Sequence, residues 1–208
     1  MKLKKKVKVT LTLILIVLFL ILGFLIYKNL FQGNGVKEAK VIGSIKEYGY
    51  ELKDNKNGTY KKMFYELESI LKEKKVDEEA YVKKITEMFI YDFYSLEDKT
   101  AKTDIGGVQF VHPHILENFT ENAQSTYYKY VESNIYGNRK QKLPMVDKVT
   151  IEDIQQGLFL VEDKEKDEEA FELKVTWTYT SDTFSDYQNS AILDFVHDGK
   201  KLQLVELK

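Results

Sequence analysis

The 208 residues are 43% apolar, 31% charged and 13% aromatic, which fits one globular domain with an appendage and excludes a largely disordered chain or a polytopic membrane protein. The absence of cysteine excludes disulfides, thiolate nucleophiles, cysteine-ligated metals and lipid-modified cysteine anchors. Residues 1–30 carry six lysines and no acid, so residues 31–208 hold 25 basic and 33 acidic residues, a net charge of −8. Such an acidic body, with Arg139 as its single arginine, disfavours nucleic acid as a partner.

The first predicted element is a stretch of nineteen residues, 9–27, that carries no charged side chain. As a helix rising about 1.5 Å per residue, it comes close to the ~30 Å needed to cross the hydrocarbon core of a bilayer. A secretory signal peptide also combines a basic start with an apolar run, but its apolar region is normally about 7 to 15 residues long and ends at small residues. Residues 33–35 (Gly-Asn-Gly) match such a cleavage site only weakly. We therefore expect an uncleaved transmembrane anchor, with a signal peptide as the alternative.

The lysines around this stretch predict its orientation. Five precede it and one, Lys28, follows it directly, and lysine and arginine are enriched on the cytoplasmic side of a span. We expect a cytoplasmic tail at residues 1–8, a transmembrane helix at 9–27, a tether at 28–43 and an extracytoplasmic domain at 44–208. The expected localisation is the cell membrane as a single-pass protein with a cytoplasmic N-terminus. The lipid bilayer and other envelope proteins are the expected partners.

Three amphipathic helices are predicted in the first part of the outer domain, after a short alternating segment at residues 48–52 and a turn at 54–58. The first helix carries one apolar stripe over residues 63–71. The second begins after Asp77, a suitable N-cap, with two glutamates in the first turn where carboxylates favour the helix dipole. The third is expected at about residues 116–131. The side chains expected to point inward from the second and third helices are Tyr81, Ile85, Met88, Phe89, Phe93, Leu96, Phe119, Ala123, Tyr127, Tyr130 and Val131.

In the last third of the chain the hydrophobic period changes to two, which indicates strands. Residues 148–161 form one long predicted strand with a bulge at Gly157. Residues 171–179 alternate apolar and polar side chains, as a half-buried antiparallel strand does. Residues 191–207 predict a hairpin around the turn at 198–199 (Asp-Gly). The fold class is therefore α+β, with an N-terminal transmembrane helix followed by about three helices packed on a curved antiparallel sheet.

This order of elements resembles the cone-shaped fold of the nuclear transport factor and ketosteroid isomerase superfamily. A short tail, one span and an outer domain of this kind are also similar to the bitopic assembly component of type IV secretion and conjugation machines. The segments at 89–96 (FIYDFYSL), 104–110 (DIGGVQF) and 128–134 (YKYVESN) resemble an uncharacterised group of single-span membrane proteins of Gram-positive bacteria. The likeness in element order covers residues 60–208, and it implies a cone-like fold more directly than a function.

Asp92 is the weak candidate for a catalytic residue. The resemblance implies an Asp or His base inside the cavity of a cone-fold isomerase. Asp92 lies in an aromatic stretch, so desolvation would raise its pKa if the side chain faced inward. Helical spacing puts it at the margin of the apolar stripe, where Lys99 or a backbone amide is the expected partner. The sequence has no nucleophile elbow, phosphate loop or dinucleotide fingerprint, so we expect no enzymatic activity and no cofactor.

The histidines are weak candidates for a metal site. His112 and His114 flank a proline and place two imidazoles on one side of an extended segment, but only Glu117 is near enough in sequence to be a third ligand. We expect instead a surface connection whose proline starts the third helix. His197, at the tip of the last hairpin, is expected to be solvated. The acidic run at 162–169 predicts a charged hairpin loop, because its interleaved lysines do not suit a calcium loop.

These observations favour a non-enzymatic, membrane-anchored extracytoplasmic domain that acts by protein–protein contact, as a scaffold or assembly factor, for example in a secretion or conjugation complex. Sheet edges and an exposed aromatic rim are the expected contact surfaces. Trp177, Tyr179 and Phe184 are the candidates because aromatic residues dominate interface hot spots. The alternative is a small-ligand-binding or isomerase-like cone-fold domain that uses Asp92. A homo-oligomer is compatible with either function.

Overall fold

The computed structural model describes residues 17, 19, 21, 22, 39–161 and 165–208. The chain divides into two units, Met1–Glu38 and Ala39–Lys208. Most of the predicted membrane span, residues 9–27, lies outside the described residues. Its four described residues, Val17, Phe19, Ile21 and Leu22, have helical backbone and exposed side chains. Among the described residues, no helix is both long enough and apolar enough to cross a bilayer.

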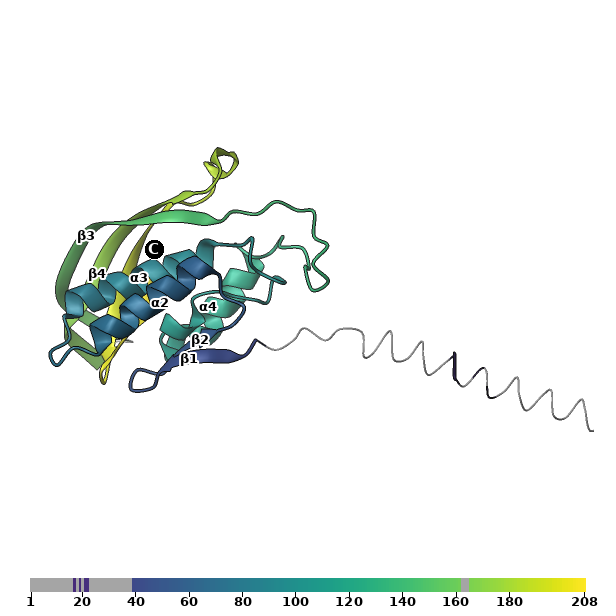
Figure 1. The fold of residues 1–208 in the computed structure, drawn as a ribbon. Helices are drawn as coiled ribbons and strands as arrows, with labels where there is room; N and C mark the ends of the chain where they lie inside the picture. Colours follow the sequence, from purple (N-terminus) through teal and green to yellow (C-terminus); the bar gives the residue numbers. More distant parts are fainter. Residues whose placement is uncertain (1–16, 18, 20, 23–38, 162–164) are drawn as a thin grey trace, which may run out of the picture. The chain divides into compact units, whose positions relative to one another are not determined.

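The unit Ala39–Lys208 is an α+β body in which three helices lie on a four-stranded antiparallel sheet. Figure 1 shows the long strands of this sheet curving around the helices. A two-stranded hairpin precedes the helices, and two short 3-10 helices lie in connections. The helices are α2 (Gly58–Leu71), α3 (Glu78–Tyr94) and α4 (Pro113–Ser125), and the 3-10 helices are η1 (Val108–Phe110) and η2 (Asp182–Phe184). The hairpin is β1 (Val41–Ile45) and β2 (Tyr50–Lys53), and the sheet runs in the order β3 (Val146–Val161), β4 (Glu165–Tyr179), β5 (Ser190–Asp198), β6 (Lys201–Leu207).

Helices α2 and α3 begin at the caps that their sequences favour. The side chain of Asn57 accepts a hydrogen bond from the Tyr60 amide, and that of Asp77 accepts one from the Ala80 amide. The predicted stripe of α2 is buried or partly buried against the core. All six side chains predicted inward for the second helix are buried, although the last of them, Leu96, follows the helix end. The expectations for these two helices are confirmed.

Helix α4 begins and ends earlier than the predicted range of 116–131. Pro113 occupies the first turn and the His112 side chain accepts a hydrogen bond from the His114 amide, so the helix starts directly at the proline. It ends at Ser125 because the next residues turn, which lets the Tyr128 hydroxyl donate to the Phe93 carbonyl oxygen at 2.6 Å in the core. The expected inward position of Tyr130 is therefore wrong. It lies beyond the helix and is 76% exposed.

The predicted strands are confirmed, including the bulge, but β4 begins at Glu165 and so includes most of the acidic run at 162–169 that was expected to be a loop. The β3–β4 register shifts between Gly157 and Phe159, where one strand carries an extra residue. The apolar side chains of β4 alternate with exposed ones, and β5 and β6 join at Gly199, whose φ of 62° suits a tight turn. Strand β1 starts at Val41, inside the stretch expected to be a tether. Two hydrogen bonds close the hairpin at this point. The Lys40 amide donates to the Asp54 side chain, and the Asp54 amide donates to the Lys40 carbonyl oxygen.

Candidate functional site

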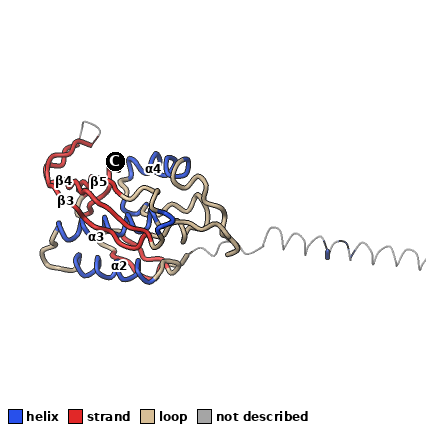
Figure 2. The backbone as a smooth tube through the Cα atoms, turned by 90° about the horizontal axis from the view of Figure 1, so that it is seen from above, coloured by secondary structure: helices blue, strands red, loops and turns tan. Residues whose placement is uncertain are grey.

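An open groove of about 480 Å³ lies between α4, the end of α3 and strand β6. Figure 2 shows α4 beside the C-terminal end of the chain, where β6 finishes. The groove combines a mainly apolar floor with polar side chains at its rim. Its apolar and aromatic lining residues are Phe93, Tyr94, Ile115, Phe119, Ala123, Tyr127, Leu204, Val205 and Leu207. Its polar lining residues are Asn118, Asn122, Thr126, Gln188, Glu206 and Lys208.

One face of α4 forms a wall of the groove. Ile115, Asn118, Asn122 and Thr126 recur every three or four residues, which brings them onto one side of the helix. Phe119, on the same side, packs on Phe93 of α3 with ring centroids 5.2 Å apart. The aromatic contact fixes α4 against α3. The amide side chains of Asn118 and Asn122 are thereby held at the rim of an apolar surface.

The other wall of the groove is the edge of the sheet. Strand β6 is the last in the sheet order, and the outer side of its first half is covered, since Leu204 accepts a hydrogen bond from the His112 amide at 2.8 Å. At its far end, Lys208 exchanges two backbone hydrogen bonds with Ile192 of β5, at 3.0 and 2.9 Å. Antiparallel pairing alternates, so the peptide groups of the preceding residue, Leu207, point away from β5. Among the described residues no further strand pairs with them.

One ammonium group and three carboxylates meet at the end of the groove, so the local charge there is negative. The Lys208 ammonium group lies 2.7 Å from a carboxylate oxygen of Asp194, 3.2 Å from one of Glu206 and 3.8 Å from one of Glu172. The hydrogen bond to Asp194 is the main reason that the pKa of Lys208 is raised. With its cation already surrounded by carboxylates, the groove is not built to select an anionic ligand. Apolar contact and peptide-like hydrogen bonding are the chemistry that it offers.

Asp92 lies in the interior of the body and not in the groove. Its Oδ1 atom is 2.5 Å from the Lys56 ammonium group and 2.8 Å from that of Lys99, while its Oδ2 accepts a hydrogen bond from the Gly107 amide at 2.9 Å. Both partners expected from the sequence, Lys99 and a backbone amide, are therefore present, and Lys56 is a third. None of these residues lines the groove.

The environment of Asp92 stabilises its ionised form. Burial alone raises the pKa of this carboxyl group, but the ammonium groups of Lys99 and Lys56 lower it further, so the pKa lies well below its ordinary value. A general base near neutral pH needs a pKa closer to the working pH and an oxygen within reach of the substrate. Asp92 offers neither, since it is buried and both of its oxygens accept hydrogen bonds. The arrangement is that of a structural ion cluster.

The two glycines beside this cluster are needed for close approach. A Cβ atom on Gly106 would lie 2.0 Å from the backbone oxygen of Asp92, and one on Gly107 would lie 2.6 Å from the ring of Phe89. Gly107 also has a φ of +74°, in the left-handed region. The backbone makes a tight bend at these two residues. It brings the Gly107 amide onto the Asp92 carboxylate.

The three histidines have structural surroundings. Pro113 starts α4, as expected, but the connection before it is not all at the surface, because His112 is buried with its ring 5.1 Å from that of His114. In the part of the chain that the structure describes, no group of three potential metal ligands occurs. The expected solvation of His197 is wrong. It is partly buried and its Nδ1 lies 2.8 Å from an Asp167 carboxylate oxygen, because β5, which carries His197, pairs with β4, which carries Asp167.

The three predicted interface aromatics separate in the structure. Trp177 is only 3% exposed and packs on Tyr94 with ring centroids 4.2 Å apart, so it belongs to the core and is not available for contact. Tyr179 and Phe184 are partly exposed, and Tyr187 joins them in an aromatic cluster at η2. Sequence reasoning did name sheet edges as contact surfaces, but not the residues of the α4–β6 groove. The only feature of the sequence that marks the groove residues is that Asn118 and Asn122 lie next to apolar residues on one face of the helix.

Comparison with known proteins makes no assignment, since no family model, no curated protein and no solved structure matches the chain.

Proposed function

We propose that this chain is a membrane-anchored, extracytoplasmic protein-interaction domain that receives an extended, apolar segment of a partner protein in the α4–β6 groove. The groove is the observation that carries the proposal. It places an apolar floor beside the outward peptide groups of Leu207 and beneath the amides of Asn118 and Asn122. Side-chain amides donate and accept, as peptide groups do, so they suit a polypeptide backbone laid along the groove.

Apolar burial supplies the affinity in this proposal. A partner Leu, Ile or Phe side chain moved from water onto the floor of the groove gains about 1.5–3 kcal/mol when it is fully buried. The excess of carboxylates around Lys208 supports an apolar segment over a strongly acidic one.

The membrane anchor in this proposal rests on the sequence of residues 9–27 and on the four described residues within it. Val17, Phe19, Ile21 and Leu22 are between 51% and 74% exposed on helical backbone. Apolar side chains exposed to this extent favour contact with lipid or with another apolar surface. The similarity in element order to the cone-fold assembly component of secretion and conjugation machines makes the proteins of such machines the first partners to test.

Site-directed photocrosslinking tests the groove. A photoreactive amino acid in place of Asn122 is expected to capture a specific envelope protein in intact cells, while the same group in place of Glu121, exposed on the same helix but outside the groove, captures none. A bulky Asn118→Trp substitution should abolish capture from position 122 without lowering the midpoint of thermal unfolding. Equal capture from both positions, or none from either, would refute the proposed site.

A small apolar ligand is the second candidate, because a groove of about 480 Å³ lies within the range of ligand sites. An isomerase role for Asp92 receives no support from the groove, which Asp92 does not line. Screening for ligand-induced thermal stabilisation separates the two functions. A hit that Asn118→Trp removes would favour the small ligand, and a hit that survives this change would lie elsewhere.

A further inference from the structure

The loop between α4 and β3, residues 126–145, presents large apolar side chains to solvent. Tyr130 is 76% exposed, Tyr136 is 73% exposed and Ile135 is 42% exposed. A connection of this length without a helix or strand is uncommon inside a compact domain and usually has a function. Exposed apolar side chains of this size favour contact with another surface.

Hydrogen bonds fix this α4–β3 loop to the body, so its aromatic residues are held in their exposed positions. The Arg139 guanidinium group donates a hydrogen bond to the Lys99 carbonyl oxygen at 2.8 Å. The Gln141 side chain joins the two halves of the loop, since its amide accepts from the Glu132 backbone and donates to the Tyr130 carbonyl oxygen, both at 2.9 Å. These contacts bring the segment around Tyr130 next to the basic segment that follows Arg139.

The loop is basic although the body is acidic. It contains four basic residues and one acidic residue, whereas residues 31–208 together have a net charge of −8. Lys129, Lys140 and Lys142 are exposed, and within the described residues none of them forms an ion pair with a carboxylate. The Lys129 ammonium group lies over the Tyr130 ring, 5.2 Å from its centroid. Cations and aromatic rings therefore share one exposed surface.

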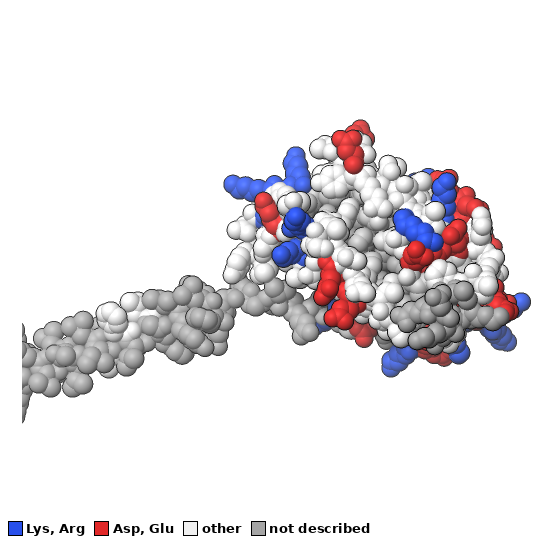
Figure 3. Space-filling view, turned by 180° about the vertical axis from the view of Figure 1, so that it is seen from behind, with Lys and Arg blue, Asp and Glu red and all other residues white. Residues whose placement is uncertain are grey.

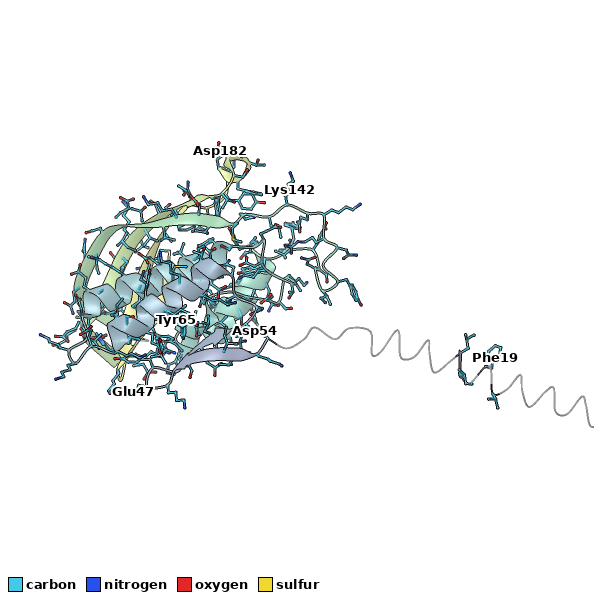
Figure 4. The ribbon with its side chains drawn as sticks, in the orientation of Figure 1. Phe19, Glu47, Asp54, Tyr65, Lys142 and Asp182 are labelled. Atoms are coloured by element: carbon cyan, nitrogen blue, oxygen red, sulfur yellow. The ribbon has the colours of Figure 1, made fainter. Side chains whose placement is uncertain are left out.

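This surface lies at the end of the body where the chain enters it. The Lys40 amide, close to the point of entry, donates a hydrogen bond to Asp54. Figure 4 shows Asp54 and Lys142 at the same end of the body. The α4–β3 loop projects from this end in Figure 1. Glu47, in the turn of the β1–β2 hairpin, lies at the opposite end in Figure 4. Seen from behind in Figure 3, several lysine and arginine side chains gather at the chain-entry end.

We infer that the α4–β3 loop docks on the surface of the anionic lipid bilayer in which the chain is anchored. Tyrosine favours the interfacial region of a bilayer, and lysine near an anionic surface gains about 1 kcal/mol. The inference rests on the anchor of the proposed function. The eleven residues between the predicted span and Ala39 reach at most roughly 40 Å when fully extended, which limits how far the body can move from the anchor.

The absence of cysteine makes a direct test simple. The full-length Asn138→Cys variant, labelled with an environment-sensitive fluorophore, is reconstituted into vesicles of phosphatidylglycerol and phosphatidylcholine that contain headgroup-spin-labelled lipid. We expect quenching and a blue shift of the emission, and neither in vesicles of phosphatidylcholine alone. The matched Glu47→Cys variant, labelled on the turn at the other end, should show neither effect in either vesicle.

Combining Asn138→Cys with Lys129→Gln, Lys140→Gln and Lys142→Gln should abolish the quenching, because each lysine removed weakens the contact about fivefold, the factor that corresponds to ~1 kcal/mol. Unquenched label in anionic vesicles, or quenching that the lysine changes leave intact, would overturn the inference. So would retention on soluble heparin without quenching, which would assign the surface to a polyanionic polymer. Resistance of the reconstituted chain to carbonate extraction tests the anchor separately, so a failed anchor and a failed docking surface are distinguishable.

Discussion

Lys99 donates a hydrogen bond to Asp92 across 2.8 Å in the interior of the body, where the lysine residue is 3% exposed and the aspartate 7%. The pair ties the end of α3 to the loop that follows it, and the Arg139 guanidinium group binds the Lys99 carbonyl oxygen from the other side. The buried ion pair and the Arg139 hydrogen bond together connect the α3 end to the α4–β3 loop.

Asp92→Asn should destabilise the protein strongly. The substitution leaves the buried Lys99 ammonium group without an anion, and breaking a buried pair in this way costs about 3–5 kcal/mol. Lys56→Gln should cost much less, because the Lys56 side chain is 22% exposed and its removal leaves Asp92 paired with Lys99. Urea unfolding monitored by Trp177 fluorescence measures both. Similar small losses for the two variants would show that Asp92 and Lys99 are not coupled in the folded state.

The stability of the protein should fall as the pH is lowered, in part through Asp92. Burial raises the pKa of Asp92, but Lys99 and Lys56 lower it more, so the folded-state pKa lies below the ordinary value of 3.8. A depressed carboxyl pKa contributes stability that is complete above the unfolded-state value and is lost as the pH falls through the folded-state value. The free energy of unfolding should therefore decline below about pH 4.

Asp167→Asn is the control for this pH dependence. Burial raises the pKa of Asp167, but hydrogen bonds from the His197 and Glu169 backbones and from the His197 side chain bring it below its ordinary value. Removing the Asp167 carboxylate should leave the contribution of Asp92 to the pH dependence of the free energy of unfolding unchanged. Asp92→Asn should remove that contribution. Unfolding curves collected at successive pH values give the comparison. An unchanged slope in Asp92→Asn would contradict the assignment.

Much of the fold was predictable because its signals are local. The caps Asn57 and Asp77 act on amides three residues away, and the alternation along β4 requires only one strand. The partners of Asp92 show the limit. Lys99 is seven residues away and was foreseen, while Lys56 is 36 residues away and nothing local marks it. The groove could not be predicted for the same reason, because its walls meet only when α4 packs beside the last strand.

Gly106→Ala should destabilise the protein, because the new methyl group would overlap the Asp92 carbonyl oxygen, 2.0 Å away, and push the turn off the carboxylate. Overpacking in a well-packed interior typically costs about 1–3 kcal/mol. Gly157→Ala is the matched control, since no atom lies within 4 Å of the position that its Cβ would take. Thermal unfolding should show a lowered midpoint for the first variant and little change for the second. Equal midpoints would mean that the turn has room to move.

Trp177→Ala and Phe184→Ala should separate the core from the surface. Trp177 of β4 packs on Tyr94 and is 3% exposed, so its truncation leaves a cavity and should cost about 3–5 kcal/mol. Phe184 is only partly buried, in the aromatic cluster at η2, and its truncation should cost less than ~1 kcal/mol because it removes contacts at the surface. Denaturant titration of each variant gives the two values. A mild effect of Trp177→Ala, together with loss of the crosslinked partner, would instead restore Trp177 as the contact residue that its aromatic character first indicated.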